Sequence, residues 1–520
     1  MSLAPDRVLV VIARTRHKMV QAELQEAAKL GAKFVELRLD YLTKAVDFKR
    51  LQPFKSGSWV ATLRRPQDGG RFNGSETERQ TILRQAIVSG VFDWVDLETD
   101  IVDNIRRFGP VKRIVSYHNL VETPADIDKI YERMLKQDGD VYKIAVMAQT
   151  PGDNQRILEL QKHAPKPTVA FCMGDFGVST RFLALKYGAP WTYAAFNRER
   201  GVAPGLPTFE DIRTTYHARL ITPNTKVYGI LGDPLGHSYS PLLHNQMFRR
   251  LKLDAIYLPF RVPSGMLPTV VPGLDRIPVS GYSVTIPHKE AAAQIAGPGA
   301  DGVVQMAGAA NTLVRQDPNG WKAFNTDYTA AVESLRAHLK EHAEDGAPLQ
   351  FSQLFVLILG AGGAARAVAH GLHKEGAHIT ITARTGERAV KLATEVQCKS
   401  IEWIARHNVT PCNVVINCTP VGMHPNTDES PIHTSFLRPG LTVFDTVYNP
   451  EQTLLIRDAR SRGCFTVTGV DMFVRQAAQQ FELFTGIAPP IDPMRELMRK
   501  AMSPVSGALE DDTDDADDMD

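Results

Sequence analysis

The segment FVLILGAGGAAR, residues 355–366, runs from an apolar stretch into a glycine-rich loop and then into an alanine-rich stretch. Continuous apolar residues predict a buried strand, and the alanine-rich stretch predicts a helix. A glycine loop between a strand and a helix is typical of dinucleotide-binding folds, in which Gly360 and Gly362 permit a tight turn and the close approach of a pyrophosphate. Ala365 takes the third glycine position. Because a glycine loop alone is as often a simple turn, the flanking elements decide this interpretation.

The next apolar stretch, HITITAR at 378–384, indicates which dinucleotide binds. Enzymes that use NAD usually carry an acidic residue at the end of this strand, where it accepts the ribose hydroxyls. This chain has Arg384 there and Arg388 four residues later. Guanidinium groups suit the 2′-phosphate of NADP, through charge-assisted hydrogen bonds of about 1.5–3 kcal/mol each. We therefore predict NADP as the cofactor; the alternative is that Arg384 is an exposed surface arginine.

Polar breaks divide the chain before this cofactor domain. The stretch EHAEDGAPLQFSQ at 341–353 precedes the glycine-loop strand, and RLITPNTK at 219–226 has the Pro, Asn and Thr of a connector. The predicted domains are a first domain at 1–220, a substrate domain at 225–340 and a cofactor domain at 350–469, with C-terminal helices at 470–500 that return to the substrate domain.

Eight short apolar runs alternate with amphipathic stretches in the first domain. Near-continuous apolar strands separated by helices are the signature of a parallel sheet, and eight such units in about 200 residues match a closed (β/α)8 barrel. The runs are VLVVIAR (8–14), FVELRLD (34–40), WVATLR (59–64), WVDLETD (94–100), RIVSYH (113–118), VYKIAVMA (141–148), TVAFCMG (168–174) and TYAAF (192–196). The predicted fold class is therefore α/β: an N-terminal (β/α)8 barrel followed by a two-domain unit with a Rossmann cofactor domain.

Composition and charge exclude several classes of protein. With 43% hydrophobic and 22% charged residues, the 520-residue chain has the composition of a globular enzyme, and no apolar run approaches the roughly 18 residues that span a bilayer. A net charge of +1 gives no reason to expect a nucleic-acid partner. Five cysteines without a CxxC pair support neither a zinc site nor a disulfide framework, so we expect no metal and a reducing cytoplasm.

The segment 503–520 ends in a strongly acidic run, EDDTDDADDMD. It has no apolar periodicity and its charges repel one another, so we predict that it is disordered. A solvated tail is favoured over a docking motif.

Polar residues inside the barrel strands indicate the chemistry of the first domain, because active-site side chains in such barrels project from the C-terminal ends of the strands. Lys143 interrupts an apolar run, and lysine is almost never buried without a partner. A functional role is therefore favoured over the alternative, in which only the aliphatic part of the side chain is buried and the amine reaches solvent. A partly desolvated amine can attack a ketone and form a Schiff base. His118 is suited to proton transfer, although a hydrogen-bonded core histidine is as common.

The same strand ends carry a carboxylate and guanidinium groups. Glu36 and Arg38 are two residues apart and share one face of a strand, from which Glu36 can orient His118. Arg38, Arg64 and Arg181 are planar donors that suit a carboxylate-bearing substrate. These residues predict imine chemistry on an anionic substrate.

Five motifs of the barrel resemble type I 3-dehydroquinate dehydratase: ELRLD (36–40), TLRRPQDGG (62–70), VSYHN (115–119), YKIAVMAQTPGD (142–153) and GDFGVSTR (174–181). The resemblance covers the whole barrel. It implies that Lys143 is the Schiff-base lysine, that His118 is the general acid and base, and that Glu36 is its orienting partner. The implied substrate clamps are Arg38, Arg64 and Arg181.

Two places depart from that family. Asp68 stands where the family usually has a glutamate before the glycine pair. The family typically reads SAPGQ where this chain reads VAPGL (202–206), so Val202 and Leu206 replace a serine and a glutamine that hold the substrate. Losing two polar contacts costs roughly 0.5–1.5 kcal/mol each, so we predict dehydratase activity with a raised KM.

Several loops after residue 225 carry polar residues beside apolar stretches. The segment GILGDPLGHSYSPLLHN (229–245) holds Ser238 and Ser240 before a predicted helix; followed by Pro241, Ser240 alone is best explained as an N-cap. The other segments are SVTIPHKE (283–290), AANTL (309–313), FNTDY (324–328), NCTPVGM (417–423), DTVYNPEQTLL (445–455) and GVDMFVRQAAQQFELFTG (469–486). Together they resemble shikimate dehydrogenase from about residue 228 to 500.

This second resemblance implies that Lys289 and Asp327 exchange a proton at the substrate hydroxyl while hydride moves to or from the nicotinamide. Ser283 stands where bacterial members often have asparagine, a difference that the plant-type fused enzyme tolerates. The implied substrate ligands are Ser238, Ser240, Thr285, Asn311, Thr326, Tyr448 and Gln476. The implied cofactor ligands are Gly360, Ala361, Gly362, Gly363, Ala364, Arg384, Thr385, Arg388, Thr419 and Gly469.

The two resemblances follow the order of the plant-type fused enzyme, and the product of the first reaction is the substrate of the second. We predict a bifunctional enzyme of the shikimate pathway, and so of aromatic amino acid biosynthesis, that dehydrates 3-dehydroquinate and reduces 3-dehydroshikimate to shikimate with NADPH. One alternative is a shikimate or quinate dehydrogenase with a weakened or structural barrel. A metabolite-sensing regulator is disfavoured by Lys143, Lys289 and Asp327. The predicted partners are small-molecule substrates, with no nucleic acid and no membrane.

Overall fold

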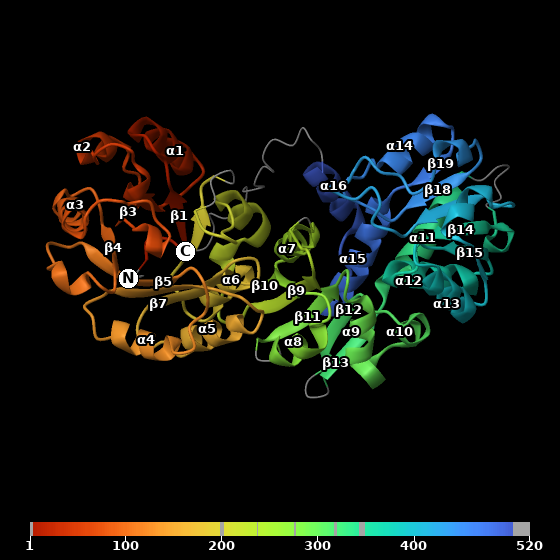
Figure 1. Ribbon diagram of the computed structural model, residues 1–520, viewed down its shortest axis with the longest axis horizontal. Helices are drawn as coiled ribbons and strands as arrows, with labels where there is room; N and C mark the ends of the chain where they lie inside the picture. The colour runs from red at the N-terminus through yellow and green to blue at the C-terminus, as the bar shows by residue number, and fades with distance from the viewer. Residues whose placement is uncertain are drawn as a thin grey trace. The chain divides into compact units, whose positions relative to one another are not determined.

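The computed structural model describes residues 4–197, 202–236, 238–274, 277–316, 320–342 and 349–502 (Figure 1). The chain divides into two compact units, which are described separately. The first comprises Met1–Val227, Phe248–Val262 and Thr269–Pro278, and the second comprises Tyr228–Met247, Pro263–Pro268 and Val279–Asp520. The acidic segment at 503–520, predicted to be disordered, lies outside the described residues.

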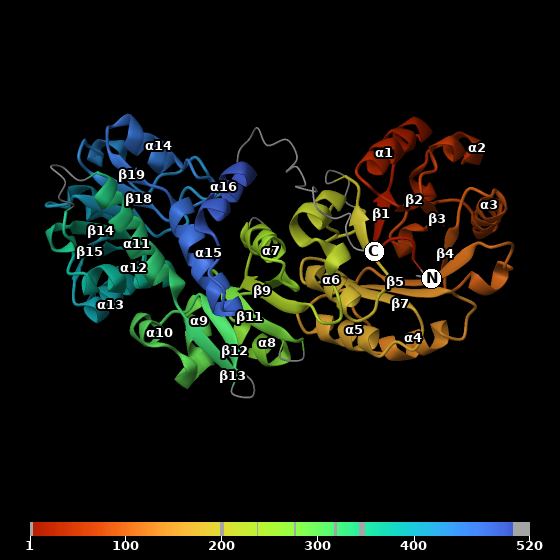
Figure 2. The ribbon, with the colours of Figure 1, turned by 180° about the vertical axis from the view of Figure 1, so that it is seen from behind.

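The eight predicted barrel strands form one parallel sheet in the order β7-β6-β5-β4-β3-β2-β1-β8, which confirms the (β/α)8 architecture. The strands are β1 Val8–Ile12, β2 Phe34–Arg38, β3 Ser58–Thr62, β4 Trp94–Glu98, β5 Lys112–Asn119, β6 Val141–Met147, β7 Thr168–Met173 and β8 Thr192–Ala195. The helices are α1 His17–Lys29, α2 Phe48–Leu51, α3 Glu76–Val88, α4 Ile127–Met134, α5 Asp153–Lys162 and α6 Val178–Lys186. Figures 1 and 2 show α4 and α5 along the outside of β5 and β7.

The barrel is nearly closed, with one seam that backbone hydrogen bonds do not pair. Among the strands described, β8 pairs with β1, but β7 and β8 form no ladder. Two N–H groups of β7 donate to side chains instead: Ala170 N to Gln161 Oε1 at 2.8 Å, and Cys172 N to Thr180 Oγ1 at 2.9 Å. Gln161 on α5 and Thr180 on α6 are buried. Their side-chain oxygens therefore accept hydrogen bonds from β7 backbone N–H groups that would otherwise need a neighbouring strand.

Aromatic rings fill the end of the barrel where the strands begin. Phe34 is the first residue of β2 and Trp94 the first of β4, and both rings contact Trp191 just before β8, with ring centroids 5.2 and 5.5 Å apart. All three side chains are buried. This packing closes the N-terminal end of the barrel and leaves polar side chains at the opposite end.

A five-stranded sheet in the order β10-β9-β11-β12-β13 follows the barrel in sequence, with β11, β12 and β13 paired antiparallel. The strands are β9 Lys226–Gly232, β10 Ala255–Arg261, β11 Val279–Val284, β12 Thr312–Gln316 and β13 Gly320–Phe324. The helices are α7 Ser240–Arg250, α8 Leu267–Leu274, α9 Lys289–Ala296, α10 Gly302–Ala307 and α11 Thr326–Glu341. Within the described ranges, no helix is long and apolar enough to cross a membrane.

The predicted Rossmann domain is a six-stranded parallel sheet in the order β16-β15-β14-β17-β18-β19. The strands are β14 Phe355–Leu359, β15 His378–Thr382, β16 Lys399–Ser400, β17 Val414–Asn417, β18 Thr442–Asp445 and β19 Phe465–Val467. The helices are α12 Gly363–Lys374, α13 Gly386–Val396, α14 Leu454–Ser461, α15 Gly469–Thr485 and α16 Ile491–Met502. The strand order reverses at β14, and dinucleotides bind at such a switch point.

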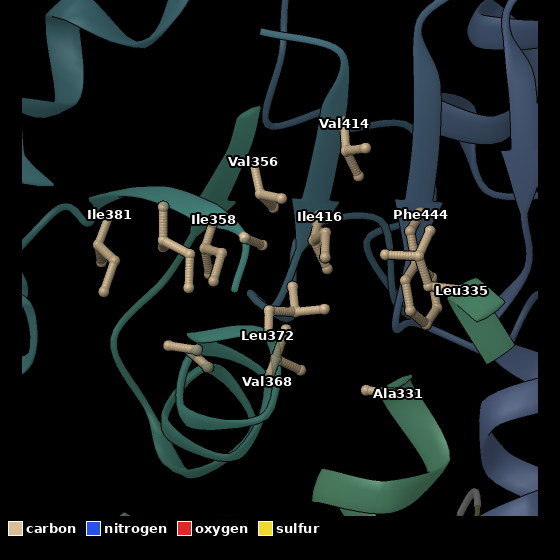
Figure 3. Close-up of a cluster of buried hydrophobic side chains, with 14 of the residues drawn as sticks. Ala331, Leu335, Val356, Ile358, Val368, Leu372, Ile381, Val414, Ile416 and Phe444 are labelled. Atoms are coloured by element: carbon tan, nitrogen blue, oxygen red, sulfur yellow. The ribbon is translucent and has the colours of Figure 1, made fainter. Parts of the chain in front are cut away.

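The core of this domain lies between the sheet and two helices. Figure 3 shows Ile358 of β14, Ile416 of β17 and Phe444 of β18 facing Leu372 of α12 and Leu335 of α11. All five side chains are at most 1% exposed. Because the first turn of α11 also carries the predicted catalytic residue Asp327, this core fixes that residue relative to the cofactor sheet.

Candidate active sites

The C-terminal ends of the barrel strands surround a cavity of about 250 Å³. The six residues predicted for a dehydratase site all line it: Glu36, Arg38, Arg64, His118, Lys143 and Arg181. The remaining wall includes Asp68, Phe171, Tyr193, Val202 and Leu206. Acidic, basic and apolar groups therefore share one small enclosed space.

Lys143 lies in the middle of β6 and is only 3% exposed. Its Nζ donates to Asp96 Oδ2 at 3.2 Å and lies 4.4 Å from the centroid of the Tyr193 ring. Burial lowers the pKa of Lys143 and the positive charge of Arg64 lowers it further, while Asp96 opposes both. The amine therefore loses its proton more readily than a lysine in solvent, which is the condition for attack on a ketone.

Lys143 stands at one end of a row of alternating buried charges. Arg79 on α3 donates to Glu98, which also accepts from Arg64 Nε at 3.3 Å. Arg64 Nη2 donates to Asp96 Oδ2 at 2.8 Å, the oxygen that accepts from Lys143. Burial raises the pKa of Glu98 to about 7. Although burial also opposes ionisation of Asp96, Lys143 and Arg64 hold its pKa well below the usual range, so Asp96 stays charged and holds the amine in place.

His118 is a neutral base at physiological pH. Burial, followed by the charges of Arg64 and Lys143, lowers the pKa of His118 well below its usual value. Neither ring nitrogen has a hydrogen-bond partner in the part of the chain that the structure describes. The imidazole is therefore able to accept a proton from a bound molecule.

Glu36 does not make the predicted contact with His118. Its Oε1 accepts a hydrogen bond from the Thr62 hydroxyl at 2.6 Å. Glu36 lies on β2 and Thr62 on the adjacent β3, whereas His118 lies on β5, three strands along the sheet from β2. The prediction that Glu36 orients His118 is therefore corrected, because strand order gives Glu36 a nearer partner.

The three predicted guanidinium clamps differ in their partners. Arg38 donates to both carboxylate oxygens of Asp40, at 2.9 and 2.8 Å. Arg181 forms no ion pair within the described residues; its Nη2 donates to Pro204 O at 3.3 Å, its guanidinium carbon lies 4.3 Å from the Phe171 ring centroid, and its Nε has no partner. Burial lowers the pKa of Arg181 to about 9. Of the three arginines, Arg181 is therefore the one whose buried charge an anionic ligand would stabilise most.

The two apolar replacements contribute no polar group to the cavity. Val202 and Leu206 line it and pack against the buried apolar cluster inside the barrel. Sequence reasoning missed Asp96, Glu98 and Arg79. The signal for the first two was present, because they lie two residues apart in WVDLETD, the spacing that singled out Glu36 and Arg38.

In the second unit, Lys289 and Asp327 meet at the starts of two helices. Lys289 is the first residue of α9, and Asp327 is the second residue of α11, behind the N-cap Asn325. Lys289 Nζ lies 2.5 Å from Asp327 Oδ2, and the two side chains are 15% and 7% exposed. A Cβ at Gly363 would lie 2.9 Å from Lys289 Cβ. The structure therefore brings the pair together directly beside the glycine loop.

Two clusters of predicted substrate ligands form nearby in the same unit. Asn311 Nδ2 donates to Thr326 Oγ1 at 2.9 Å and to Gln476 Oε1 at 3.4 Å, and Asn311 Oδ1 accepts from Thr326 N. Tyr448 hydrogen-bonds with Ser238, and burial raises its pKa to about 12. The Tyr448 hydroxyl therefore stays protonated and able to donate.

The last two predicted substrate ligands, Thr285 and Ser240, lie at strand and helix ends. Thr285 lies against Gly232, where an added Cβ would be 2.4 Å from Thr285 Cγ2. Ser240 is the first residue of α7, and its N–H donates to Ser238 Oγ at 3.3 Å. Ser238 Oγ therefore accepts the N–H of the first residue of this helix.

The glycine loop between β14 and α12 leaves room for a ligand. Gly360 has a φ of +112°, and a Cβ there would lie 3.1 Å from Cys418 O, so a side chain does not fit. Gly362 is the N-cap of α12 without a side-chain cap, and open space surrounds its missing Cβ. Ala361, Gly363 and Ala364 complete this turn and the first turn of α12. The free N–H groups of a helix N-terminus with space in front of them fit a pyrophosphate.

The predicted 2′-phosphate residues follow β15. Arg384 and Thr385 are exposed, and Arg384 forms no ion pair in the described parts of the chain. Arg388 on α13 pairs with Glu290 at 2.8 Å, and both side chains are about half exposed. A single free guanidinium therefore stands at the predicted position, rather than two.

The remaining cofactor candidates flank the same switch point. Thr419, just after β17, is held by Asn417, whose Oδ1 accepts from both Thr419 N and Thr419 Oγ1 at 3.0 and 2.7 Å. Gly469 begins α15, where a Cβ would lie 2.4 Å from Val447 O. Only glycine permits this approach of α15 to the segment after β18.

Family models match four regions of this chain. They are described as type I 3-dehydroquinase at residues 8–223, shikimate dehydrogenase substrate binding domain at 230–313, shikimate/quinate 5-dehydrogenase at 341–423 and shikimate 5′-dehydrogenase C-terminal domain at 469–499. In this order, the four regions overlap the barrel, the five-stranded sheet, the cofactor sheet and the last two helices.

Individual relatives match either the whole chain or its second part. A bifunctional 3-dehydroquinate dehydratase/shikimate dehydrogenase of Arabidopsis thaliana is 36% identical, with 94% of this chain and 83% of the relative covered. A shikimate dehydrogenase (NADP(+)) of Methanosarcina mazei is 39% identical over 53% of this chain and 99% of its own length. A solved shikimate dehydrogenase of Thermus thermophilus, in complex with NADP(H) and shikimate, is 30% identical over 53% of this chain and 99% of that chain, with a TM-score of 0.47.

Proposed function

The chain belongs to the family of bifunctional 3-dehydroquinate dehydratase/shikimate dehydrogenases, and from this membership we propose how its own residues carry out two successive reactions. It is a lyase and an NADP-dependent oxidoreductase, which converts 3-dehydroquinate to 3-dehydroshikimate and reduces that product to shikimate. The observation that carries the proposal is a partly or fully buried lysine paired with an aspartate in each unit: Lys143 with Asp96 and Lys289 with Asp327.

In the barrel, the Lys143 amine attacks the ketone carbon of 3-dehydroquinate, and loss of water leaves a protonated imine. The imine withdraws electrons from the adjacent carbon, so neutral His118 removes a proton there. The electron pair expels the hydroxyl of the next carbon, which takes the proton from His118 and leaves as water. Hydrolysis of the imine then releases 3-dehydroshikimate and restores the amine. Arg181, which lacks an ion-pair partner among the described residues, binds the substrate carboxylate.

In the second unit, Lys289 protonates the ketone oxygen of 3-dehydroshikimate as that oxygen becomes a hydroxyl. Asp327 accepts a hydrogen bond from Lys289, and so holds the Lys289 amine in one position. Asn311, Thr326, Gln476, Ser238 and Tyr448 bind the carboxylate and the other hydroxyls of the ring, together with Thr285 and Ser240. The Lys289–Asp327 pair therefore acts only on the oxygen, at the edge of the glycine loop.

NADPH, when bound, supplies the hydride for this reduction. The cradle at Gly360 and Gly362 fits its pyrophosphate, because an added Cβ at Gly362, the N-cap of α12, would meet no described atom within 4 Å. Arg384 lies where the 2′-phosphate is expected, and its charge is not neutralised by a carboxylate of the described chain. Thr419, after β17, and Gly469, at the start of α15, would contact the nicotinamide end of the cofactor.

One assay tests both sites at once. Purified full-length enzyme with 3-dehydroquinate as the carbon substrate is expected to oxidise NADPH, because the reductase can act only on the product of the barrel. The loss of NADPH absorbance and the appearance of shikimate by chromatography are measured. Oxidation with 3-dehydroshikimate but not with 3-dehydroquinate would contradict the proposal and support the alternative of a structural barrel, which the apolar Val202 and Leu206 favour.

Restoring the two polar residues is expected to strengthen substrate binding in the barrel. Val202→Ser together with Leu206→Gln supplies two hydrogen bonds of about 0.5–1.5 kcal/mol each, so the KM for 3-dehydroquinate falls about 5- to 150-fold. Steady-state kinetics of dehydration measure the change, with the KM for 3-dehydroshikimate in the reductase reaction as the internal control. An unchanged dehydratase KM would show that these positions do not face the substrate.

Neutralising Asp96 is expected to shift the pH profile of dehydration. Asp96 raises the pKa of Lys143, so Asp96→Asn lowers it further, and the free amine persists at lower pH. The acid limb of kcat/KM therefore moves down by about 1–3 pH units, the usual effect of a close opposite charge. Asp100→Asn is the matched control, because Asp100 follows the same strand but is exposed. A limb that stays in place in Asp96→Asn argues against this assignment.

The preference for NADPH is expected to depend on Arg384 more than on Arg388. Arg384→Ala removes a charge-assisted contact of about 1.5–3 kcal/mol, so the KM for NADPH rises about 10- to 150-fold while the KM for NADH changes little. Arg388→Ala is expected to have the smaller effect, because Glu290 already pairs with that guanidinium. Equal losses in the two variants, or an equal loss for NADH, would be inconsistent with this placement.

We propose that the enzyme works in a reducing compartment, the cytoplasm. The five cysteines are all free thiols rather than disulfides, which agrees with reducing conditions. The Arabidopsis relative is described as chloroplastic, a location that belongs to that protein.

A further inference from the structure

A second large cavity lies in the second unit, and the residues assigned to the two reactions do not line it, although Thr468 and Val470 of its wall flank Gly469. It has a volume of about 520 Å³, and its wall comes from α11, α14, β19, the start of α15, and α16 (Figure 1). A volume of this size is typical of pockets that hold small metabolites. None of its described lining residues belongs to the catalytic, substrate or cofactor sets above.

Four arginines and three carboxylates line this cavity. Two of the arginines form ion pairs there and two do not. Arg475 and Arg495 both pair with Asp471, each at 2.8 Å. Among the described residues, Arg460 donates only to neutral oxygens, Gln452 Oε1 at 2.6 Å and Thr466 Oγ1 at 3.2 Å. Arg499 is exposed and has no ion pair with any described residue. Arg460 and Arg499 thus have no ion-pair partner among the described residues, and with Glu341 and Glu451 counted, the charged side chains of the lining sum to +1.

The buried wall of the cavity has polar atoms in need of partners. Ser334 and His338 lie one turn apart on α11 and are 2% and 8% exposed. Neither Ser334 Oγ nor His338 Nε2 has a hydrogen-bond partner among the described residues. Burial lowers the pKa of His338 to about 4, so the ring is neutral at physiological pH. Buried polar atoms without partners are uncommon in proteins and often mark the place of a ligand.

The cavity also touches the positive end of a long helix. Thr468 and Val470 line it at the start of α15, which extends over 17 residues, and the N-cap Thr468 makes no side-chain cap. Unsatisfied N–H groups and the helix dipole favour an anion at such an end. Guanidinium forks, a hydroxyl and a helix N-terminus together are the groups that surround tetrahedral phosphate in proteins.

We propose that this cavity is a binding site for a small phosphate-bearing metabolite, held by Arg460 and Arg499 at the rim and by Ser334 and His338 on the buried wall. The site is separate from the phosphate contacts of NADPH. Carboxylates are the competing source of anionic oxygens, either from a free polycarboxylate or from the acidic segment at 510–520 of the same chain.

Calorimetric titration of the full-length enzyme with inorganic pyrophosphate tests this site. Saturating NADP⁺ is present throughout, so that the glycine loop is occupied. Pyrophosphate is expected to bind, and the Arg460→Ala/Arg499→Ala variant is expected to bind at least ten times more weakly. Ser334→Ala, which leaves every charge in place, is expected to weaken binding severalfold. Arg457→Ala is the matched control, because Arg457 lies on the same helix α14, is exposed and does not line the cavity.

Three results would overturn the proposal. The first is binding that is absent, or that is equally strong in the Arg460→Ala/Arg499→Ala variant and in wild type. The second is citrate binding as tightly as pyrophosphate, which would assign the site to polyanions in general. The third is a tenfold gain in pyrophosphate affinity when the acidic residues of 510–520 are replaced by their amides, which would make that segment the occupant.

Discussion

Lys143→Ala is expected to abolish dehydration of 3-dehydroquinate and to leave the reduction of 3-dehydroshikimate unchanged. The amine is the nucleophile of the proposed imine, and no other lysine lines the barrel cavity among the described residues. Loss of a covalent nucleophile lowers kcat on the order of 10⁴- to 10⁶-fold. Asp96 keeps Arg64 as a partner in the variant, so the remaining charges are still paired. The rate of enone formation is the measurement.

Borohydride trapping makes this prediction sharper. Wild-type enzyme incubated with 3-dehydroquinate and borohydride gains the mass of one reduced adduct on the peptide that contains Lys143. Lys162→Ala, which removes an exposed lysine of the barrel, keeps the adduct, whereas Lys143→Ala loses it. An adduct on another lysine, or dehydration that survives in Lys143→Ala, would remove Lys143 from the mechanism.

Lys289→Ala is expected to lower kcat of the reductase by about 10²- to 10⁴-fold, the usual contribution of a positioned proton donor. The kcat of Asp327→Asn is expected to fall by a similar factor, because a neutral amide does not attract Lys289 through charge. The two losses are not additive, since both residues act through one proton. Single-turnover oxidation of NADPH with 3-dehydroshikimate measures the chemical step.

The fused chain provides the control for these variants. Dehydratase kinetics report whether the protein remains folded in its first unit, and NADP⁺ affinity reports whether the glycine loop remains intact. Both are expected to match wild type in Lys289→Ala. Undiminished kcat in this variant would disprove the assignment, and a weakened NADP⁺ affinity of similar size would make Lys289 a structural neighbour of Gly363 instead.

The architecture was predictable because its signals are local and repeated. Each barrel strand is a short apolar run, and the glycine loop lies between a strand and a helix at 355–366. Lys143 was recognisable because lysine is almost never buried in a strand unless its charge is paired or has a function. The open seam between β7 and β8 was not predictable, since it depends on side-chain oxygens of Gln161 and Thr180 that reach the strand from neighbouring helices.

Which residues belong to each site was easier to predict than which of those residues contact one another. Glu36 was expected beside His118, but strand order gives it Thr62 instead. Arg388 is predicted to bind the cofactor phosphate, and its ion pair with Glu290, which is far away in sequence, was not predicted. The sequence alone does not fix which of several buried charges become neighbours, because this depends on register and on the direction of each side chain.

The row of alternating charges from Arg79 to Lys143 limits how this barrel can change during evolution. Removing Arg79 leaves buried Glu98 with Arg64 as its remaining ion-pair partner among the described residues, and breaking a buried pair costs up to about 3–5 kcal/mol, out of the roughly 5–15 kcal/mol that stabilise a typical domain. A lineage that loses Arg79 is therefore stabilised if Glu98 is also replaced by a neutral residue. Positions 79 and 98 are expected to covary among descendants of this gene, while the exposed positions around them drift independently.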